Sequence, residues 1–189
     1  MNARQHEEEQ LLLVTRRFRV ASVQETTSDG TQRRREVIRH PGSVAIVPVV
    51  DESHVCLIRN FRVSAGKALV EIPAGTLEPD EDPRAAAWRE LAEETGYRAD
   101  KLELLTACYL SPGILDERMH VFVATGLTLG QAAREPGEQI ENLVVTWDEA
   151  IQQIRDGTIQ DAKTIVGVLG YLLSVNQYPD QGAKCRTPT

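Results

Sequence analysis

The most restrictive feature of the sequence is the acidic segment GTLEPDEDPRAAAWRELAEETGY, which runs from Gly75 to Tyr97 and carries seven carboxylates. Asp82 followed by Pro83 is typical of a helix N-cap with proline in the first turn. The residues RAAAWRELAEE that follow are almost all good helix formers, and Gly96 stands where a left-handed residue commonly ends a helix. The segment therefore predicts one short helix that begins at Pro83 and ends before Gly96.

Three of these carboxylates, Glu90, Glu93 and Glu94, are spaced so that they share one face of that helix. Like charges at this spacing destabilise an isolated helix by about a few tenths of a kcal/mol, and the negative end of the helix dipole adds to the penalty. A divalent cation would offset the repulsion, and Mg²⁺ or Mn²⁺ needs only hard oxygen ligands. The alternative is a solvated acidic face, which is what an isolated charge run usually means.

The rest of the chain alternates strand-like and helix-like patterns. Residues 11–23 and 33–40 flank the turn signal TTSDG and predict a β-hairpin. Thr146 and Glu149 have the spacing of a capping box, which predicts a helix that Gly157 ends. Further strands are predicted at residues 43–50, 54–63, 101–110, 118–127 and 141–147, and a final helix at residues 165–175.

These patterns predict an α/β chain whose main domain covers residues 42–178. Residues 1–41 are predicted to form a small N-terminal β-hairpin lobe, and residues 179–189 a C-terminal tail. A hairpin has little core in which to bury its apolar side. We therefore expect the lobe to take part in a homodimer.

Charge and cysteine content exclude several classes of protein. A net charge of −7 and a pI of about 5.2 argue against nucleic acid as a partner, because nucleic-acid-binding proteins usually carry a basic face. Three cysteines without zinc-like spacing fit a reduced chain. The N-terminus is acidic where a signal peptide would be basic, and no apolar run approaches the ~18 residues that a membrane span needs. The sequence predicts a cytoplasmic location and no membrane segment.

The acidic segment resembles the signature of the Nudix hydrolases. That signature is Gly, five residues, Glu, seven residues, then Arg-Glu-apolar-any-Glu-Glu-any-Gly-apolar, and here it is filled by Gly75, Glu81, Arg89, Glu90, Leu91, Glu93, Glu94, Gly96 and Tyr97. Only Tyr97 departs, being aromatic rather than aliphatic. A chance match of the seven strict positions is on the order of one in 10⁸ per window. LIRNFR, EIPAG and SPG nearby resemble the ADP-ribose pyrophosphatase branch.

The resemblance implies a fold, a cofactor and a set of ligands. The fold is an α/β/α sandwich with a mixed β-sheet between helices, and the cofactor is Mg²⁺, with Mn²⁺ as a substitute. The implied metal ligands are the backbone carbonyl of Ala74 and the side chains of Glu90, Glu93, Glu94 and Glu138. Arg89 is expected to pair with Glu81 or Glu93 and to orient them.

The resemblance also implies a general base on an acidic loop downstream, where AREPGEQIEN offers Glu135, Glu138 and Glu141. We expect Glu138 to be the base, so that Glu93, Glu94 and Glu138 are the expected catalytic residues. The alternative for each loop acid is an ordinary solvated side chain.

Substrate contacts are implied at five further positions. Arg62 matches an arginine of the strand before the signature and is expected to pair with a phosphate. Arg35 matches an arginine that reaches the substrate across a dimer in relatives, although it also belongs to the basic surface run RRRE. Ser111 and Gly113 are expected to shape a loop at the ribose, and Glu117 to bind metal or substrate.

The activity implied is hydrolysis of ADP-ribose to AMP and ribose 5-phosphate with Mg²⁺. Another nucleotide sugar, such as GDP-mannose or ADP-glucose, is the alternative substrate, because specificity resides in loops outside the signature. A non-catalytic nucleotide-sugar-binding module is a further alternative. It predicts a broken signature, whereas this one is intact.

Overall fold

The computed structural model of the protein describes residues 9–133 and 140–175. Its N-terminal lobe is an antiparallel sheet in the order β1-β2-β3, made of β1 (Glu9–Val14), β2 (Arg19–Thr26) and β3 (Gln32–Arg39). The predicted two-stranded hairpin is therefore incomplete. Residues 11–23 form two strands rather than one, because the hydroxyl of Thr15 binds backbone amides of the next residues and turns the chain.

A mixed sheet forms the middle of the main domain, as predicted. Its order is β7-β4-β10-β9, and β4 runs parallel to β10 while the other neighbours are antiparallel. β4 is buried along its whole length, which explains its continuous apolar sequence. The strands are β4 (Ser43–Pro48), β7 (Ala74–Thr76), β9 (Lys101–Tyr109) and β10 (Arg118–Thr125).

A second, antiparallel sheet has the order β12-β5-β6 and consists of β5 (His54–Arg62), β6 (Lys67–Glu71) and β12 (Ile140–Thr146). A short pair joins β8 (Tyr97–Arg98) to β11 (Thr128–Leu129). The segment TLGQAAREPGEQ, residues 128–139, has the composition of a loop. Its first two residues pair instead, and the amide of Gly130 donates to the carbonyl of Gly96 at 2.8 Å, which holds this segment beside the end of the acidic helix.

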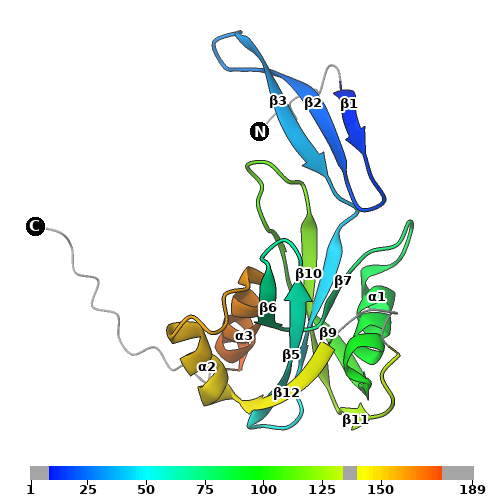
Figure 1. Ribbon diagram of the computed structural model, residues 1–189, viewed down its shortest axis with the longest axis vertical. Helices are drawn as coiled ribbons and strands as arrows, with labels where there is room; N and C mark the ends of the chain where they lie inside the picture. The colour runs from blue at the N-terminus through cyan, green and yellow to red at the C-terminus, as the bar shows by residue number, and fades with distance from the viewer. Residues whose placement is uncertain (1–8, 134–139, 176–189) are drawn as a thin grey trace, which may run out of the picture.

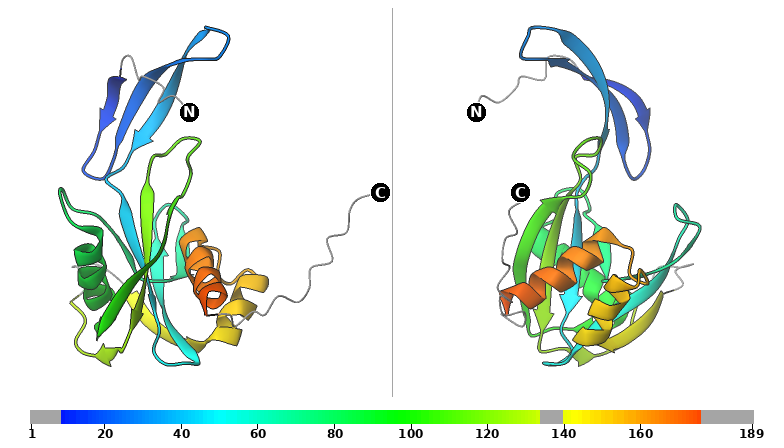
Figure 2. Two further views of the ribbon diagram at one scale, coloured as in Figure 1. Left: turned by 180° about the vertical axis from the view of Figure 1, so that it is seen from behind. Right: turned by 90° about the vertical axis from the view of Figure 1, so that its left-hand side faces the viewer.

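Helices cover both faces of the mixed sheet (Figures 1 and 2). α1 (Pro83–Glu90), continued by a π-helical turn (Leu91–Thr95), lies on one side, and α2 (Trp147–Arg155) and α3 (Ala162–Ser174) lie on the other. The alternation of side chains along β4 divides the core accordingly. Val44 and Ile46 pack in the cluster that contains Ala86, Ala87 and Leu91 of the acidic helix, and Ala45 and Val47 pack in the cluster that contains residues of α2 and α3. This is the α/β/α sandwich that the sequence predicted.

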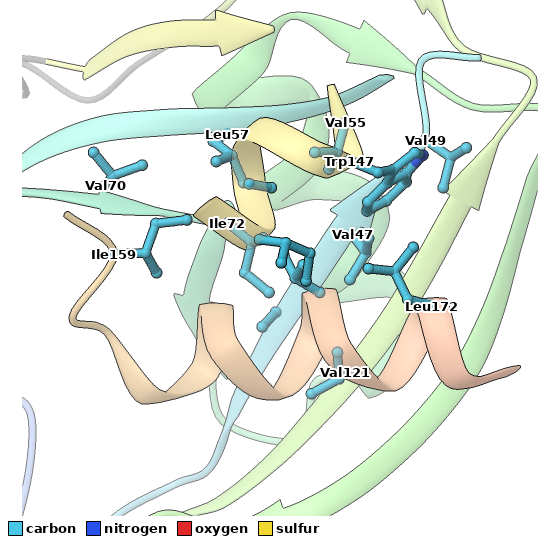
Figure 3. Packing of buried hydrophobic residues seen from close by; sticks show 14 of the residues in the cluster. Val47, Val49, Val55, Leu57, Val70, Ile72, Val121, Trp147, Ile159 and Leu172 are labelled. Carbon is cyan, nitrogen blue, oxygen red and sulfur yellow. The ribbon is translucent and has the colours of Figure 1, made fainter. Parts of the chain in front are cut away.

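The larger cluster is built around Trp147 at the start of α2. Figure 3 shows its ring near Val49 and Val55, with Leu172 on α3 close by. The ring stacks on Tyr171, with centroids 4.7 Å apart. The predicted capping box is present, because the amide of Glu149 donates to Thr146 and the amide of Thr146 donates to Glu149. None of the helices within the described ranges is long and apolar enough to cross a bilayer.

The lobe is fastened to the main domain beside the loop that joins β9 to β10. The amide of Ile38 donates to the carbonyl of Ile114 at 2.8 Å, and the amide of Asp116 donates to the carbonyl of Ile38 at 3.1 Å. The carboxylate of Asp116 also accepts from Arg39 at 3.1 Å and from the amide of His40 at 2.8 Å. These contacts hold the last strand of the lobe against residues 111–117.

Candidate active site

The ends of the acidic helix are formed as predicted. The Asp82 carboxylate accepts hydrogen bonds from the amides of Arg84 and Ala85, at 3.0 and 3.1 Å, and Pro83 is the first helical residue. Gly96 adopts φ +77°, and its amide donates to the carbonyl of Ala92. The α-helix ends at Glu90, however, and residues 91–95 form a wider π turn. The side chain of Asn142 on β12 caps this turn by donating to the carbonyl of Thr95 at 2.8 Å.

Glu90 and Glu94 pack against the short strand β7. Glu94 is only 5% exposed, and its carboxylate accepts a hydrogen bond from the amide of Ala74 at 2.9 Å. The Glu90 carboxylate lies directly over Gly75, where a Cβ atom would be only 1.8 Å from Oε1 of Glu90. The sequence therefore needs glycine at position 75 for the close approach of this carboxylate to the backbone.

Arg89 binds three of the acids in the signature. Its Nε and Nη2 atoms donate to the two oxygens of Glu81, both at 3.0 Å, and Nη1 donates to Glu90 at 2.7 Å and Glu93 at 3.0 Å. The bond from Arg89 lowers the pKa of Glu81 below its ordinary value, and Glu81 in turn raises the pKa of Arg89. Arg89 thus contacts both of the acids that the sequence proposed as its alternative partners.

The donor set suits a hard divalent cation. Within residues 9–133 and 140–175, no three side chains of the His, Cys, Asp and Glu types already converge as a cation site. Arg89 lies between Glu90 and Glu93 and contacts one oxygen of each, so the second oxygen of each is not held by it. Carboxylates beside a glycine cradle, without histidine or cysteine, fit Mg²⁺ or Mn²⁺ rather than zinc.

These acids line a cavity of about 640 Å³, a size typical of small-molecule sites. The cavity is bounded by the strand and loop before α1, by the acidic helix, by Arg62 on β5 and by the turn between β1 and β2. Its lining residues are Arg16, Arg17, Arg62, Ala74, Gly75, Thr76, Leu77, Glu78, Pro79, Arg89, Glu90, Glu93 and Glu94.

Arg62 reaches the cavity from a buried ionic network. Its guanidinium donates to both oxygens of Glu71, at 2.8 and 2.6 Å, and Lys163 on α3 contacts the same carboxylate at 2.5 Å. Burial raises the pKa of Glu71, but the hydrogen bonds and charges of Arg62 and Lys163 outweigh it and leave that pKa below its ordinary value. Asp161, the N-cap of α3, pairs with Lys163 at 3.0 Å on the far side. Arg62 is therefore held in one orientation.

Four of the predicted substrate contacts do not line this cavity within one chain. Arg35 is 62% exposed and pairs with Glu25 on the lobe. Ser111 and Gly113 lie on the exposed part of the β9–β10 loop. Glu117 accepts a hydrogen bond from the hydroxyl of Ser43 at 2.6 Å.

Of the three loop acids, only Glu141 falls within the residues that the structure describes. Glu135 and the preferred base Glu138 lie outside the described residues. Glu141 lies at the start of β12, is 63% exposed, and pairs with Arg59 at 2.9 Å. Glu141 is not among the residues that line the cavity.

Sequence reasoning missed four charged residues that the structure brings to the site or next to it. Arg16 and Arg17 line the cavity from the lobe, and Glu71 and Lys163 hold Arg62. The only sequence signal for Glu71 was its place in EIPAG, just before the signature. TRRFR carried no signal, because its position depends on how the lobe docks.

Comparison with known proteins gives a consistent result. Residues 39–166 match the family model described as NUDIX domain. The chain is 41% identical to "Methanol dehydrogenase activator" of Bacillus methanolicus and 42% identical to "ADP-ribose pyrophosphatase" of Bacillus subtilis (strain 168), each over 74% of this chain and 77% of the relative. It is 34% identical to "GDP-mannose pyrophosphatase" of Cronobacter sakazakii, over 74% of this chain and 82% of the relative.

The fold is also shared with a solved structure. "Crystal structure of ADP compounds hydrolase" superposes with a TM-score of 0.80 and 23% identity, and the match covers 94% of this chain and 98% of that one. The family model spans more than half of the chain, and Gly75, Arg89, Glu90, Glu93 and Glu94 of the signature line the cavity. The chain therefore belongs to the NUDIX family.

Proposed function

We propose that the protein is a metal-dependent pyrophosphohydrolase that cleaves the diphosphate of a nucleotide sugar, with ADP-ribose cleaved to AMP and ribose 5-phosphate. One observation carries the proposal: the intact signature gathers Glu90, Glu93 and Glu94 in a cavity that Arg62 also lines. The relative named ADP-ribose pyrophosphatase, at 42% identity, supports this choice of substrate.

In this proposal a divalent cation, Mg²⁺ with Mn²⁺ as a substitute, is held by Glu90, Glu93, Glu94, Glu138 and the carbonyl of Ala74. Such a cation neutralises phosphate charge and activates water when bound. Glu138 is the proposed general base.

The residues of the chain itself have separable tasks. Arg89 orients Glu81, Glu90 and Glu93 through its four hydrogen bonds. Arg62, aligned by Glu71, donates to a phosphate oxygen of the substrate. Fixing these groups before the substrate arrives lowers the cost of ordering them during the reaction.

A second candidate substrate is GDP-mannose, which the name of the relative from Cronobacter sakazakii favours. ADP-glucose would use the same chemistry with another leaving group. A panel of nucleoside-diphosphate sugars assayed with Mg²⁺ and with Mn²⁺ distinguishes these substrates by kcat/KM. Binding without turnover at millimolar Mg²⁺ would favour the non-catalytic alternative.

Two substitutions test the assigned roles. Glu94→Gln removes a metal ligand and Glu138→Gln removes the base, so each should lower kcat by about 10²-fold or more. Glu103→Gln is the matched control, because Glu103 is exposed on β9, pairs with Lys101 and does not line the cavity. If Glu138→Gln turns over normally, the base role moves to Glu135 or Glu141.

We further propose that the protein acts as a homodimer, joined through the lobe of residues 1–41, with a domain at residues 42–178 and a tail at residues 179–189. Arg35, Ser111, Gly113 and Glu117 would then complete the site in part from the partner subunit. The exposed leucines of β1 support the proposal, since each is about half exposed. The net charge of −7 supports an enzyme without a nucleic-acid partner, because it would repel the phosphate backbone. The free thiols of Cys56 and Cys108 support a cytoplasmic location.

A further inference from the structure

The turn between β1 and β2 presents two arginines at its tip. The amide of Thr15 donates to the carbonyl of Phe18 at 3.0 Å, which closes the turn, and the Thr15 hydroxyl donates to the same carbonyl at 2.8 Å. The hydroxyl also accepts from the amides of Arg17 and Phe18, at 3.2 and 3.0 Å. Arg16 and Arg17 occupy the two central positions, so a closed turn carries both side chains.

This turn lies at the end of the lobe that faces the loop before α1 (Figures 1 and 2), and both arginines line the same cavity as the signature acids. The two sets of charges occupy different walls. The acids come from α1 and the π turn after it, whereas the arginines come from the lobe. A ligand that touches both sets must therefore extend across the cavity.

The other cations of the cavity are matched by acids, and these two are not. Arg62 is bound to Glu71, and Arg89 is bound to Glu81, Glu90 and Glu93. Across the described ranges of the chain, neither guanidinium of the turn, on Arg16 or on Arg17, forms a hydrogen bond or an ion pair with a carboxylate. Two positive charges thus line a cavity in which the proposed function places an anionic ligand.

We infer that Arg16 and Arg17 bind a phosphomonoester group of the substrate, in addition to the diphosphate that is cleaved. The inference rests on the proposed function and narrows its substrate class to nucleotide sugars that carry one further phosphate. A phosphomonoester holds a charge of about −1.5 to −2 at neutral pH, which two guanidinium groups match. Arginine also presents a planar pair of donors that fits two phosphate oxygens.

The kinetic test compares ADP-ribose with its 2′-phosphorylated counterpart as substrates. The wild type should favour the phosphorylated compound by about tenfold or more in kcat/KM, the effect of one or two charge-assisted hydrogen bonds. The double variant Arg16→Gln/Arg17→Gln should lose this preference, chiefly through a higher KM for the phosphorylated compound. Its kcat/KM for ADP-ribose should fall at least about tenfold less than its kcat/KM for the phosphorylated compound.

Arg19→Gln is the matched control. The substitution removes a positive charge from the same lobe, and Arg19 does not line the cavity. It should keep the full preference. Two outcomes overturn the inference. One is a wild type that shows no preference for the phosphorylated compound. The other is an equal loss on both substrates in the double variant, which would mean that the two arginines contact the cleaved diphosphate itself.

A binding measurement separates this inference from the proposed function. Adenosine 2′-monophosphate, which carries the further phosphate and no diphosphate, is titrated into the protein by calorimetry in the presence of a chelator, so that neither turnover nor metal contributes. The wild type should bind at least about tenfold more tightly than Arg16→Gln/Arg17→Gln, and Arg19→Gln should match the wild type. Equal affinities overturn the inference, whereas a difference without hydrolysis of any diphosphate refutes the proposed function and leaves the phosphate site standing.

Discussion

Glu71 places a negative charge where almost no water reaches, since its side chain is 1% exposed. Burying a carboxylate is costly unless cations and hydrogen bonds replace the lost water. Arg62 and Lys163 supply both, and they come from β5 and from α3, so one carboxylate ties Arg62 to a helix on the far side of the sheet. The orientation of Arg62 is thus fixed by the core rather than by the cavity.

Glu71→Gln should lower the free energy of unfolding by about 3 kcal/mol, the lower end of the cost of breaking a buried ion pair. Lys163 keeps Asp161 as a partner, and Arg62 is 36% exposed, so water compensates part of its loss. Urea unfolding at pH 7 measures the change. Glu141→Gln breaks an exposed pair with Arg59 and should cost no more than about 1 kcal/mol. Equal effects of the two substitutions would show that the buried network contributes no special stability.

The same carboxylate predicts a pH dependence of stability. The pKa of Glu71 is lower in the folded protein than its ordinary value of 4.5, because the attraction of its cations outweighs burial. A group with a depressed folded pKa contributes stability above the unfolded pKa and loses it as the pH falls through the folded pKa. The difference in unfolding free energy between the wild type and Glu71→Gln should therefore be constant above about pH 4.5 and shrink below it. Urea unfolding at a series of pH values between 7 and 3 measures that difference.

At the scale of elements, the acidic helix illustrates what local sequence can and cannot specify. Its N-cap, its proline and its final glycine were predicted from residue type, because each acts through its own backbone or its near neighbours. The π turn was not predicted. It displaces Glu93 and Glu94 relative to the face that a regular helix would give them, and it is capped by Asn142, a residue that arrives only when β12 docks.

Asp82→Ala should reduce the free energy of unfolding by about 0.5–2 kcal/mol, because two helix amides lose their acceptor. Glu52→Ala, at an exposed turn outside any helix, is the control and should change stability by less than about 0.5 kcal/mol. Both values are read from urea unfolding curves. A neutral Asp82→Ala would mean that packing of α1 alone determines where the helix begins.

The charged contacts of the site also divide into those set by local sequence and those set by tertiary structure. Arg89 pairs with Glu93 one turn away, and the sequence predicted this pair. Arg62 on β5 pairs with Glu71 on the neighbouring β6, although the register places Arg62 opposite Lys67 and Glu71 opposite Ile58. The pair therefore depends on how the long arginine side chain lies in the folded protein. The partners of Glu71 and the place of Arg16 in the cavity depend on how strands and the lobe dock, so neither could be assigned from sequence position.

At the scale of the whole molecule, the lobe exposes a group of large apolar side chains on β1. On β1, Leu11, Leu12 and Leu13 are 52%, 51% and 52% exposed, although neighbouring residues of a strand point to opposite faces. Both faces of this edge strand are therefore apolar and open, and β1 has a strand neighbour only on the β2 side within the described ranges. Such an edge is normally covered or blunted.

A dimer formed through this edge should be seen by sedimentation at micromolar concentration. Leu11→Glu/Leu13→Glu should shift the protein toward monomer, because it places charges in the apolar contact. Leu104→Glu, at an equally exposed leucine on β9, should leave the mass unchanged. A wild-type monomer would contradict the dimer and remove Arg35 from the site.

The attachment of the lobe beside the β9–β10 loop has a mechanical consequence. Ile114 and Asp116 bind the last strand of the lobe through backbone and side-chain hydrogen bonds. The same end of the lobe carries the Arg16–Arg17 turn, because Arg19 pairs with Arg39 across β2 and β3. Any displacement of this end of the lobe is therefore transmitted to residues 111–117 through these bonds. A ligand that moves the Arg16–Arg17 turn away from the acids would then also displace the segment that carries Ser111 and Gly113, so both loops would respond together when a ligand enters or leaves.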